Sequence, residues 1–362
     1  MRHRYSVLFL LSACTALTPG SLRAQLVPTF NLLYTFKAQG GYPGALVEVQ
    51  PGRFFGIVSN GPGIFSITSA GSYQYFYVFP PQRSGLAVFG LTPALNGQVY
   101  GSAANLGTTL TFSELFSVTP NDKVATYSYA NTQGVPFDQI QSPYGLYGFI
   151  GAPGGLTFDR FDYKGNATPL YTFPAGSGKV IGAPFLGLDG AFYGMMISSN
   201  TSTVGIFRIT ASGAFSWVVP SFSTGGVYYT INLIQASNGN FYGTVPGGVS
   251  GAGGGSIYEV TPSGQMTTLY QFPNKVVGIP ETLLEASDGM IYGTTRGLFA
   301  TGYNGYSSLF QLNPSTGQVK TVFSFQNVLD GECECSIVQG SDGKLYGGAT
   351  NFGEYQLGTL FS

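Results

Sequence analysis

Short runs in which apolar and polar residues alternate recur along the whole chain, separated by glycine-rich turns. The copy that begins at Leu283 contains four of them, Leu283–Ser287, Met290–Thr295, Ser308–Leu312 and Lys320–Phe325, labelled A to D below. They are rich in Tyr, Phe, Thr, Val and Ile, which suit a pleated, half-buried strand. Outside the N-terminus no window has the 3.6-residue apolar period of a helix. The pattern predicts four β-strands in each copy.

Each copy carries a Tyr-Gly or Phe-Gly pair in run B, at intervals of 45 to 54 residues. The glycines are Gly56, Gly101, Gly148, Gly194, Gly243, Gly293 and Gly347. Asn-Gly or Asp-Gly pairs stand between runs A and B in most copies and suit tight hairpin turns. Four strands repeated at about 45 residues are typical of a β-propeller blade. We expect the aromatic residue before each glycine to pack between blades, because aromatic side chains bury large areas.

The two ends of the chain predict how these blades close into a ring. The last copy has runs A to C, whereas Leu32–Phe36 near the N-terminus nearly duplicates the D run Leu170–Phe173. Closure protects strand edges that would otherwise promote aggregation. We therefore predict an all-β fold, one seven-bladed β-propeller over residues 25–362. Each blade has four antiparallel strands, and an N-terminal strand joins the three C-terminal ones to complete the last. A β-solenoid, with its coils stacked in a line, is the competing architecture.

The N-terminus has the pattern of a secretory signal peptide. Basic residues in Met1–Tyr5 precede the apolar stretch Ser6–Leu17, and a Pro-Gly pair and the small residue Ala24 follow. This stretch is too short to span a bilayer as a helix. We expect residues 1–24 to be removed and the protein to be secreted, periplasmic or on the outer cell surface. The alternative is a lipoprotein, in which Cys14 is acylated and anchors the chain.

Composition limits the chemistry of the mature chain. Removal of residues 1–24 takes away His3, the only histidine, and leaves 12 basic and 16 acidic residues. Without histidine there is no Ser-His-Asp or Cys-His triad and no His-rich zinc site. Calcium-loop and phosphate-loop motifs do not occur. We expect no cofactor, no bound metal, no nucleic-acid partner and no membrane insertion once the signal is removed.

Two cysteines remain in the mature chain, Cys333 and Cys335, just before the last run A. An exported protein favours a disulfide. Residues i and i+2 of an extended strand, however, lie at the limit of disulfide reach, so a bend would be needed. The pair is interpreted as a disulfide, as packed or free thiols, or as a metal pair with Glu332 or Glu334.

Run A carries a recurrent polar position, four residues before the glycine of the A–B turn. It is occupied by Glu48, Gln141, Gln235, Glu285 and Gln339 in five copies, and by Pro93 and Leu186 in the other two. Because run A is nearest the axis of a propeller, these residues form a polar ring along the channel if they point inward. Glu48 and Glu285 could then serve as a general acid/base pair. The alternative is that the ring hydrates the channel or satisfies neighbouring backbone groups.

The lengths of the connections distinguish the two faces of the ring. The A–B and C–D turns are short and uniform, whereas the B–C and D–A connections are long and vary between copies. In an antiparallel blade these variable connections emerge on the same face, and variable loops on a rigid frame are where binding usually resides. The candidate ligand-binding residues on this loop-rich face are Tyr303, Tyr306, Asp330 and Glu332.

The copies between Leu233 and Phe361 resemble a known repeat. Leu233–Gly243, Ile257–Gly264 and Leu269–Phe272 are similar to the choice-of-anchor tandem repeat GloVer family of exported bacterial proteins, and Asp330-Gly331 before the last run A fits the same pattern. The resemblance implies a repeat protein that is secreted or on the cell surface. It brings no established activity and no catalytic residues.

These observations favour an exported, non-catalytic binding or display scaffold whose ligand is unknown; an extracellular glycan, peptide or protein is possible. One alternative is a carbohydrate-active hydrolase or lyase that uses the glutamates of the polar ring. The other is a structural envelope protein without a specific ligand. Replacing Glu48 and Glu285 with glutamine distinguishes the first alternative, and a glycan and peptide array distinguishes the second.

Overall fold

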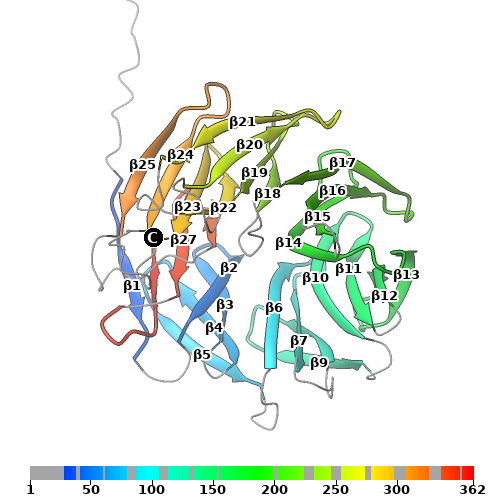
Figure 1. The fold of residues 1–362 in the computed structure, drawn as a ribbon. Coiled ribbons are helices and arrows are strands. Elements are labelled where there is room, and N and C mark those ends of the chain that lie inside the picture. The colour runs from blue at the N-terminus through cyan, green and yellow to red at the C-terminus, as the bar shows by residue number, and fades with distance from the viewer. Residues whose placement is uncertain are drawn as a thin grey trace, which may run out of the picture.

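Seven four-stranded antiparallel sheets surround a common axis, which confirms the predicted all-β, seven-bladed β-propeller (Figure 1). The computed structural model describes residues 28–37, 41–59, 62–79, 86–105, 113–129, 134–152, 155–198, 203–223, 232–245, 254–273, 279–296, 307–325, 336–350 and 353–362. These residues form strands and turns and contain no helix. It follows that no described segment is a long apolar helix of the kind that crosses a membrane.

Strands A and B form the inner half of every blade. The A strands are β2 (Pro43–Gln50), β6 (Leu86–Pro93), β10 (Val135–Ser142), β14 (Lys179–Leu186), β18 (Leu233–Gln235), β22 (Ile279–Glu285) and β26 (Ile337–Gln339). The B strands are β3 (Arg53–Val58), β7 (Val99–Asn105), β11 (Gly145–Ala152), β15 (Phe192–Ile197), β19 (Phe241–Val245), β23 (Ile291–Arg296) and β27 (Leu345–Ala349). Blades are numbered 1 to 7 in this order.

Strands C and D form the outer half. The C strands are β4 (Gly63–Thr68), β8 (Ser113–Val118), β12 (Gly155–Phe161), β16 (Thr203–Ile209), β20 (Ser256–Val260), β24 (Ser308–Leu312) and β28 (Thr359–Phe361). The D strands are β5 (Tyr73–Val78), β9 (Val124–Tyr129), β13 (Ala167–Thr172), β17 (Phe215–Ser223), β21 (Met266–Gln271), β25 (Val319–Ser324) and, in blade 7, β1 (Leu32–Thr35).

The ring closes through the two ends of the chain, as the sequence predicts. Each A strand contacts the A strands of both neighbouring blades, and β26 of blade 7 contacts β2 of blade 1. Strand β1 pairs antiparallel with β28, with Leu32 opposite Phe361 and Thr35 opposite Thr359. The blue β1 accordingly lies in the same sheet as the red β27 in Figure 1. A linear stack of coils, the alternative architecture, is thereby excluded.

The core of the protein lies between the blades. Its buried apolar side chains form seven clusters, and each cluster joins two neighbouring blades. The aromatic residue before each B-strand glycine belongs to these clusters, as expected; Tyr147 of blade 3, for example, contacts Phe192 of blade 4 with ring centroids 4.6 Å apart. A blade therefore depends on both neighbours to bury its faces.

The glycine of each Tyr-Gly or Phe-Gly pair makes room for a ring on strand C. In six blades the residue opposite this glycine is aromatic, as for Gly243 and Tyr258. A Cβ atom on Gly243 would lie 2.2 Å from the Tyr258 ring. In blade 3 the opposite residue is instead Asp159, which is buried. Blade 3 thus departs from its sister blades at a central packing position.

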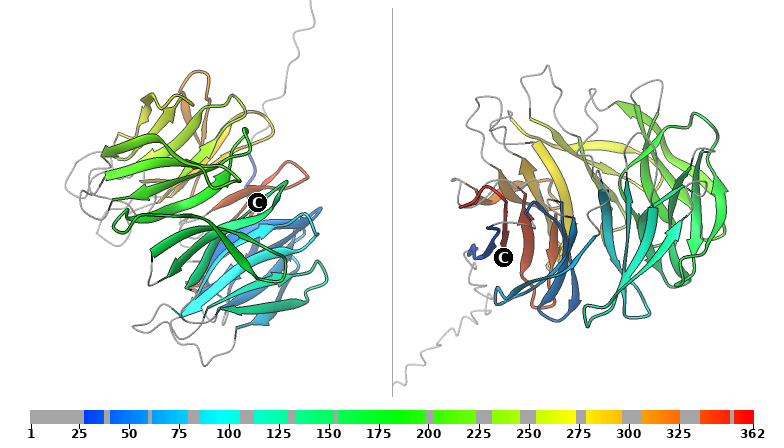
Figure 2. Two further views of the ribbon diagram at one scale, coloured as in Figure 1. Left: turned by 90° about the vertical axis from the view of Figure 1, so that its right-hand side faces the viewer. Right: turned by 90° about the horizontal axis from the view of Figure 1, so that it is seen from below.

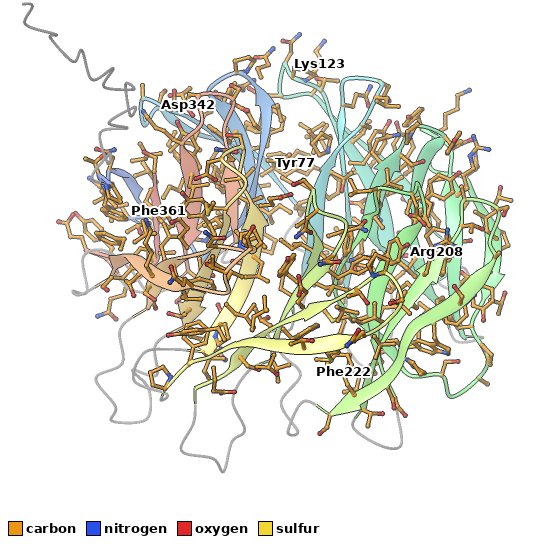
Figure 3. The ribbon with its side chains drawn as sticks, turned by 90° about the horizontal axis from the view of Figure 1, so that it is seen from above. Tyr77, Lys123, Arg208, Phe222, Asp342 and Phe361 are labelled. Carbon is orange, nitrogen blue, oxygen red and sulfur yellow. The ribbon has the colours of Figure 1, made fainter. Side chains whose placement is uncertain are left out.

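The strand order gives the ring two different faces. The A–B and C–D turns emerge on one face, called the turn face below, and the B–C and D–A connections emerge on the other, the loop face (Figure 2). In Figure 3 Asp342 and Lys123 lie at the turn face, and Phe222 lies toward the loop face. B–C connections range from residues 153–154 in blade 3 to residues 297–307 in blade 6.

Candidate functional site

The polar residues predicted to line the channel all lie on A strands, or directly after one, and are half-buried. They share one contact: each accepts a hydrogen bond from the backbone amide at the start of the A–B turn in the preceding blade. The Gln339 side-chain oxygen accepts from Ser287 at 2.8 Å, and that of Gln235 from Leu188 at 2.9 Å. Polar groups that are removed from water need such partners. These side chains therefore act as latches between blades.

The glutamines also bind their own turns. The side-chain nitrogens of Gln141, Gln235 and Gln339 donate to the carbonyl of the turn glycine four residues later, at 3.0, 2.8 and 2.9 Å. Each glutamine side chain thus bonds a backbone amide of the preceding blade and a backbone carbonyl of its own blade. The spacing of four residues in the sequence reflects this local contact.

The two glutamates form latches of the same kind with serine. Glu285 accepts from the amide and the hydroxyl of Ser237, at 2.7 and 2.6 Å. Glu48 accepts from the amide and the hydroxyl of Ser341, at 2.8 and 2.9 Å, and from the Gly52 amide at 2.7 Å. Both carboxylates are thus engaged by fixed protein donors. Within the described residues no hydrogen bond joins two members of the ring, and their service as an acid/base pair stays a prediction.

Two interfaces have no latch residue, because Pro93 and Leu186 occupy the position in blades 2 and 4. At the first of these interfaces an arginine crosses between the blades. Arg53 of blade 1 pairs with Asp122 on the C–D turn of blade 2 at 2.6 Å and donates to the Pro120 carbonyl at 2.5 Å. The turn face is therefore cross-linked there as well, by a different pair of side chains.

The A–B turns are fixed by a second repeated contact. The Asn or Asp before the turn glycine bonds the hydroxyl of the B-strand tyrosine at 2.8–3.0 Å in blades 2, 4, 5, 6 and 7. In blade 4 the carboxylate of Asp189 also binds Arg208, at 2.7 Å. Burial raises the pKa of Asp189, but hydrogen bonds from the Ala191 amide, Arg208 and Tyr193 outweigh it and hold that pKa below its ordinary value. Sequence reasoning missed this role, although the four-residue spacing between the two residues is visible.

Blade 6 has a polar cluster beneath the loop face where blades 1, 3 and 4 carry apolar residues on strand B. The residues after the Tyr-Gly pair are Thr294, Thr295 and Arg296, in place of Phe149 and Ile150 in blade 3. Arg296 forms an ion pair with Glu281 at 3.3 Å, and the Glu281 side chain is only 8% exposed. Hydroxyl pairs surround it at 2.8 Å: Thr282 with Thr294, and Thr295 with Ser308. The blade-6 polar cluster consists of Glu281, Thr282, Thr294, Thr295, Arg296 and Ser308.

Asp138 is a carboxyl of blade 3 whose pKa is strongly raised. It lies in an irregularity of β10, at a φ of 50°, where blades 2 and 4 have the glycines Gly90 and Gly182 with φ of 41° and 67°. Asp tolerates this left-handed region better than most residues. Burial raises the pKa of Asp138 to about 7. A carboxyl of that pKa exchanges protons near neutral pH.

The remaining predicted site residues lie outside the described residues. They are Cys14, Tyr303, Tyr306, Asp330, Glu332, Cys333 and Cys335. Within the described ranges, no three His, Cys, Asp or Glu side chains come together as a metal site would require.

Comparison with models of protein families identifies the family to which the chain is related. Residues 180–362, just over half of it, match the Gloeobacter/Verrucomicrobia repeat. The chain belongs to this family. The matched residues comprise blades 4 to 7 apart from strand β1, whereas blades 1 to 3 precede them. Blade 3, with its unusual Asp159 and Asp138, is thus among the blades that precede the matched region of this repeat protein.

No curated protein matches this member of the repeat family. Solved structures resemble it at low identity. A streptogramin B lyase structure is 14% identical, with a TM-score of 0.64 over 92% of this chain and 97% of that one. A catalytically inactive virginiamycin B lyase from Staphylococcus aureus, solved with quinupristin, is 18% identical, with a TM-score of 0.62 over 92% and 99%. An oligogalacturonate lyase in complex with manganese is 12% identical, with a TM-score of 0.52 over 86% and 84%. These similarities describe the fold alone.

Proposed function

We propose that this protein is an exported, non-catalytic scaffold that binds or displays a ligand on its loop face. The observation that carries the proposal is the Arg296–Glu281 ion pair at the base of the 297–307 connection. A buried ion pair contributes little net stability, because the desolvation of both charges offsets their attraction. Blades 1, 3 and 4 carry apolar residues at the corresponding B-strand positions. A role in binding therefore explains the ion pair better than a role in folding.

The latches support the same proposal. They join neighbouring blades on the turn face at five of the seven interfaces, so the frame beneath the loop face is stiff. A stiff frame lowers the entropic cost of binding by loops that it carries. The latches also engage Glu48 and Glu285 in fixed hydrogen bonds, which leaves these carboxylates poorly placed to transfer protons to a substrate.

The loop face can be tested with an array and matched variants. The exported protein is applied to glycan and peptide arrays, and any ligand found is titrated against Tyr303→Ala/Tyr306→Ala and against Asn313→Ala. The first variant changes the 297–307 connection, and the second changes a C–D turn of the same blade on the opposite face. We expect the double variant to weaken binding tenfold or more and the control to leave it unchanged.

Other outcomes would contradict the proposal. Absence of any array ligand for a cooperatively folded protein would favour the structural envelope protein. Equal weakening by both variants would move the site away from the loop face.

A second candidate function is a carbohydrate-active hydrolase or lyase, and the raised pKa of Asp138 favours it. A carboxyl with a pKa near neutral suits general acid/base chemistry. In that case Asp138→Asn would abolish turnover on a panel of glycans, and Glu48→Gln/Glu285→Gln would do so if the ring glutamates were the catalysts. Turnover by the wild type would contradict the non-catalytic proposal.

Export belongs to the proposal and has its own test. Mass spectrometry of the protein recovered outside the cytoplasm should show a chain that begins at Gln25, converted to pyroglutamate. A diacylated Cys14 as the first residue would instead establish a lipoprotein. A chain that retains residues 1–24 in the cytoplasm would contradict export altogether.

A further inference from the structure

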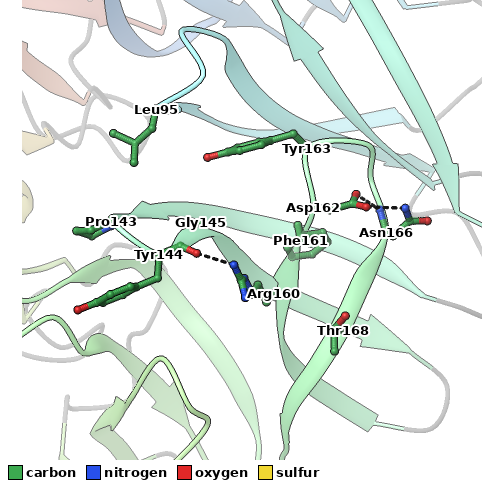
Figure 4. A pocket seen from close by; sticks show the side chains of 10 residues that line it. All are labelled: Leu95, Pro143, Tyr144, Gly145, Arg160, Phe161, Asp162, Tyr163, Asn166 and Thr168. Atoms are coloured by element: carbon green, nitrogen blue, oxygen red, sulfur yellow. Dashed lines mark hydrogen bonds between the residues drawn. The ribbon is translucent and has the colours of Figure 1, made fainter.

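Blade 3 carries a groove on the turn face, opposite to the loop face of the proposed function. It has a volume of about 510 Å³ and lies at the junction of blades 2 and 3. We call it the blade-3 groove and define it by Leu95, Pro143, Tyr144, Arg160, Tyr163 and Asn166 (Figure 4). Its size is within the range of small-molecule sites, which span roughly 300–1,000 Å³.

The groove lies where blade 3 departs from the A–B turn sequence of its sister blades. Where blades 2, 4, 5, 6 and 7 have Asn or Asp before the turn glycine, blade 3 has Tyr144. An Asn or Asp in this position reaches back to the B-strand tyrosine. Tyr144 instead extends away, with 64% of its surface exposed. Leu95, on the neighbouring turn of blade 2, is 70% exposed.

The same substitution leaves an arginine without its carboxylate. Arg160 is opposite Tyr147 in blade 3, as Arg208 is opposite Tyr193 in blade 4. Arg208 pairs with Asp189, but Arg160 donates only to the Tyr144 carbonyl, at 2.8 Å. Among the described arginines, Arg53, Arg208 and Arg296 each pair with a carboxylate, and Arg160 alone does not.

The walls of the groove are held in place by the latch residue Gln141. Its side-chain oxygen lies 3.3 Å from both the Leu95 amide and the Tyr163 hydroxyl, and its nitrogen donates to the Gly145 carbonyl. Gly145 lies beside the guanidinium, since a Cβ at this position would be 3.4 Å from Arg160 Nε. One side chain therefore fixes the turn of blade 2, the turn of blade 3 and one aromatic wall.

The chemistry of these walls defines a ligand. A guanidinium that no protein carboxylate engages can bind a ligand carboxylate with two parallel hydrogen bonds. The exposed faces of Tyr144 and Pro143 and the Leu95 side chain provide apolar contact for a ring. Polar groups follow at the other end, where the Asp162 carboxylate accepts from Asn166 at 2.7 and 2.8 Å. This negative charge disfavours a second anion there, so the carboxylate is directed toward Arg160.

We propose that the blade-3 groove binds an acidic saccharide, with the uronate carboxylate on Arg160 and a sugar ring against Tyr144. A ring with one carboxylate and many hydroxyls matches a groove that is cationic at one point, apolar along one wall and polar at its far end. The site is independent of the loop face, and neither proposal requires the other.

Calorimetric titration of the exported protein with trigalacturonate tests the site, with methyl-esterified trigalacturonate as the uncharged probe. We expect binding of the acid and at least tenfold weaker binding of the ester, because a hydrogen bond to a charged partner is lost. Arg160→Gln should weaken binding of the acid to the same degree. Arg208→Gln, the matched change in blade 4, should leave it within twofold.

Tyr144→Asp is the second variant. It restores the residue type of the sister blades, supplies Arg160 with a carboxylate and removes the aromatic wall, so it should abolish binding without lowering the melting temperature. The proposal is overturned if the folded wild type does not bind trigalacturonate, if the ester binds equally well, or if Arg160→Gln and Arg208→Gln have the same effect. Loss of binding on changing Tyr303 and Tyr306 would likewise assign the sugar to the other face.

Discussion

Glu48 of the first blade accepts hydrogen bonds from the amide and the hydroxyl of Ser341 in the last blade, at 2.8 and 2.9 Å, although the two residues are 293 positions apart. This latch joins blade 1 to blade 7, the two blades that meet where the ring closes. On the outer side of blade 7, β1 pairs with β28. The ring is thus fastened twice where it closes.

Glu48→Ala should lower the free energy of unfolding by about 1–3 kcal/mol, because it leaves donors of Ser341 and Gly52 without their partner. Glu48→Gln is the matched control, since glutamine forms this latch in blades 3, 5 and 7, and it should cost less than about 1 kcal/mol. Urea unfolding measures both. Equal stability of Glu48→Ala and the wild type would show that the latch does not stabilise closure.

Gly243→Ala should destabilise the protein by about 1–3 kcal/mol or more, since its methyl group would overlap the Tyr258 ring at 2.2 Å. Gly151→Ala is the control on a B strand, because its Cβ would meet only Phe137 at 3.5 Å, an ordinary contact. Thermal unfolding of the two variants side by side should separate them by several degrees. A harmless Gly243→Ala would disprove the packing role assigned to the repeated glycine.

The raised pKa of Asp138 predicts a pH-dependent stability. The pKa of about 7 in the folded protein exceeds the ordinary value near 3.9, so the folded state holds the proton more tightly. The resulting stabilisation is complete below about pH 4 and is lost as the pH rises to about 7, by at most about 4 kcal/mol. Asp138→Asn should remove this decline, measured by urea unfolding between pH 4 and pH 8. An unchanged profile in the variant would place the pH dependence elsewhere.

A circular permutant should fold as well as the natural chain. Asn31 and Ser362 exchange two backbone hydrogen bonds, at 2.8 and 2.9 Å, so a short glycine-rich linker can join them while the chain is opened between Phe36 and Gly41. We expect a melting temperature within a few degrees of the parent. A variant that lacks residues 28–36 is the comparison. It loses the β1 strand and the buried Phe36 side chain, 1% exposed, and should unfold at a much lower temperature. Identical melting of the truncated and full chains would contradict closure by β1.

Most of the fold is predictable from the sequence, because its signals are local and repeated. The similarity of Leu32–Phe36 to other D runs reveals which strand completes the last blade. The packing of the tyrosines between blades follows from their size alone. The reason for the glycine after each tyrosine cannot be predicted from the sequence in this way. It depends on the residue opposite in strand C, and only the register of the strand pairing identifies that residue.

The site is less predictable. Counting back from the turn glycine finds Glu48 and Gln141, but the count does not say that each contacts the turn of another blade. A partner such as Ser341 could be found only by comparing positions across copies. The blade-3 groove has a visible signal as well: Tyr144 replaces the usual Asn or Asp, and Arg160 therefore has no acid on that turn. Its meaning depends on the register that places Arg160 beside that turn.

The pairing of β1 with β28 also orders events during synthesis of the protein. Leu32–Thr35 leaves the ribosome before the strands of blades 1 to 6, and its partner Thr359–Phe361 leaves it after them. The seventh sheet can therefore form only once Thr359–Phe361 has emerged, and until then the first blade has one uncovered flank. Closure of the ring thus waits for the seventh blade, however early the middle blades take shape.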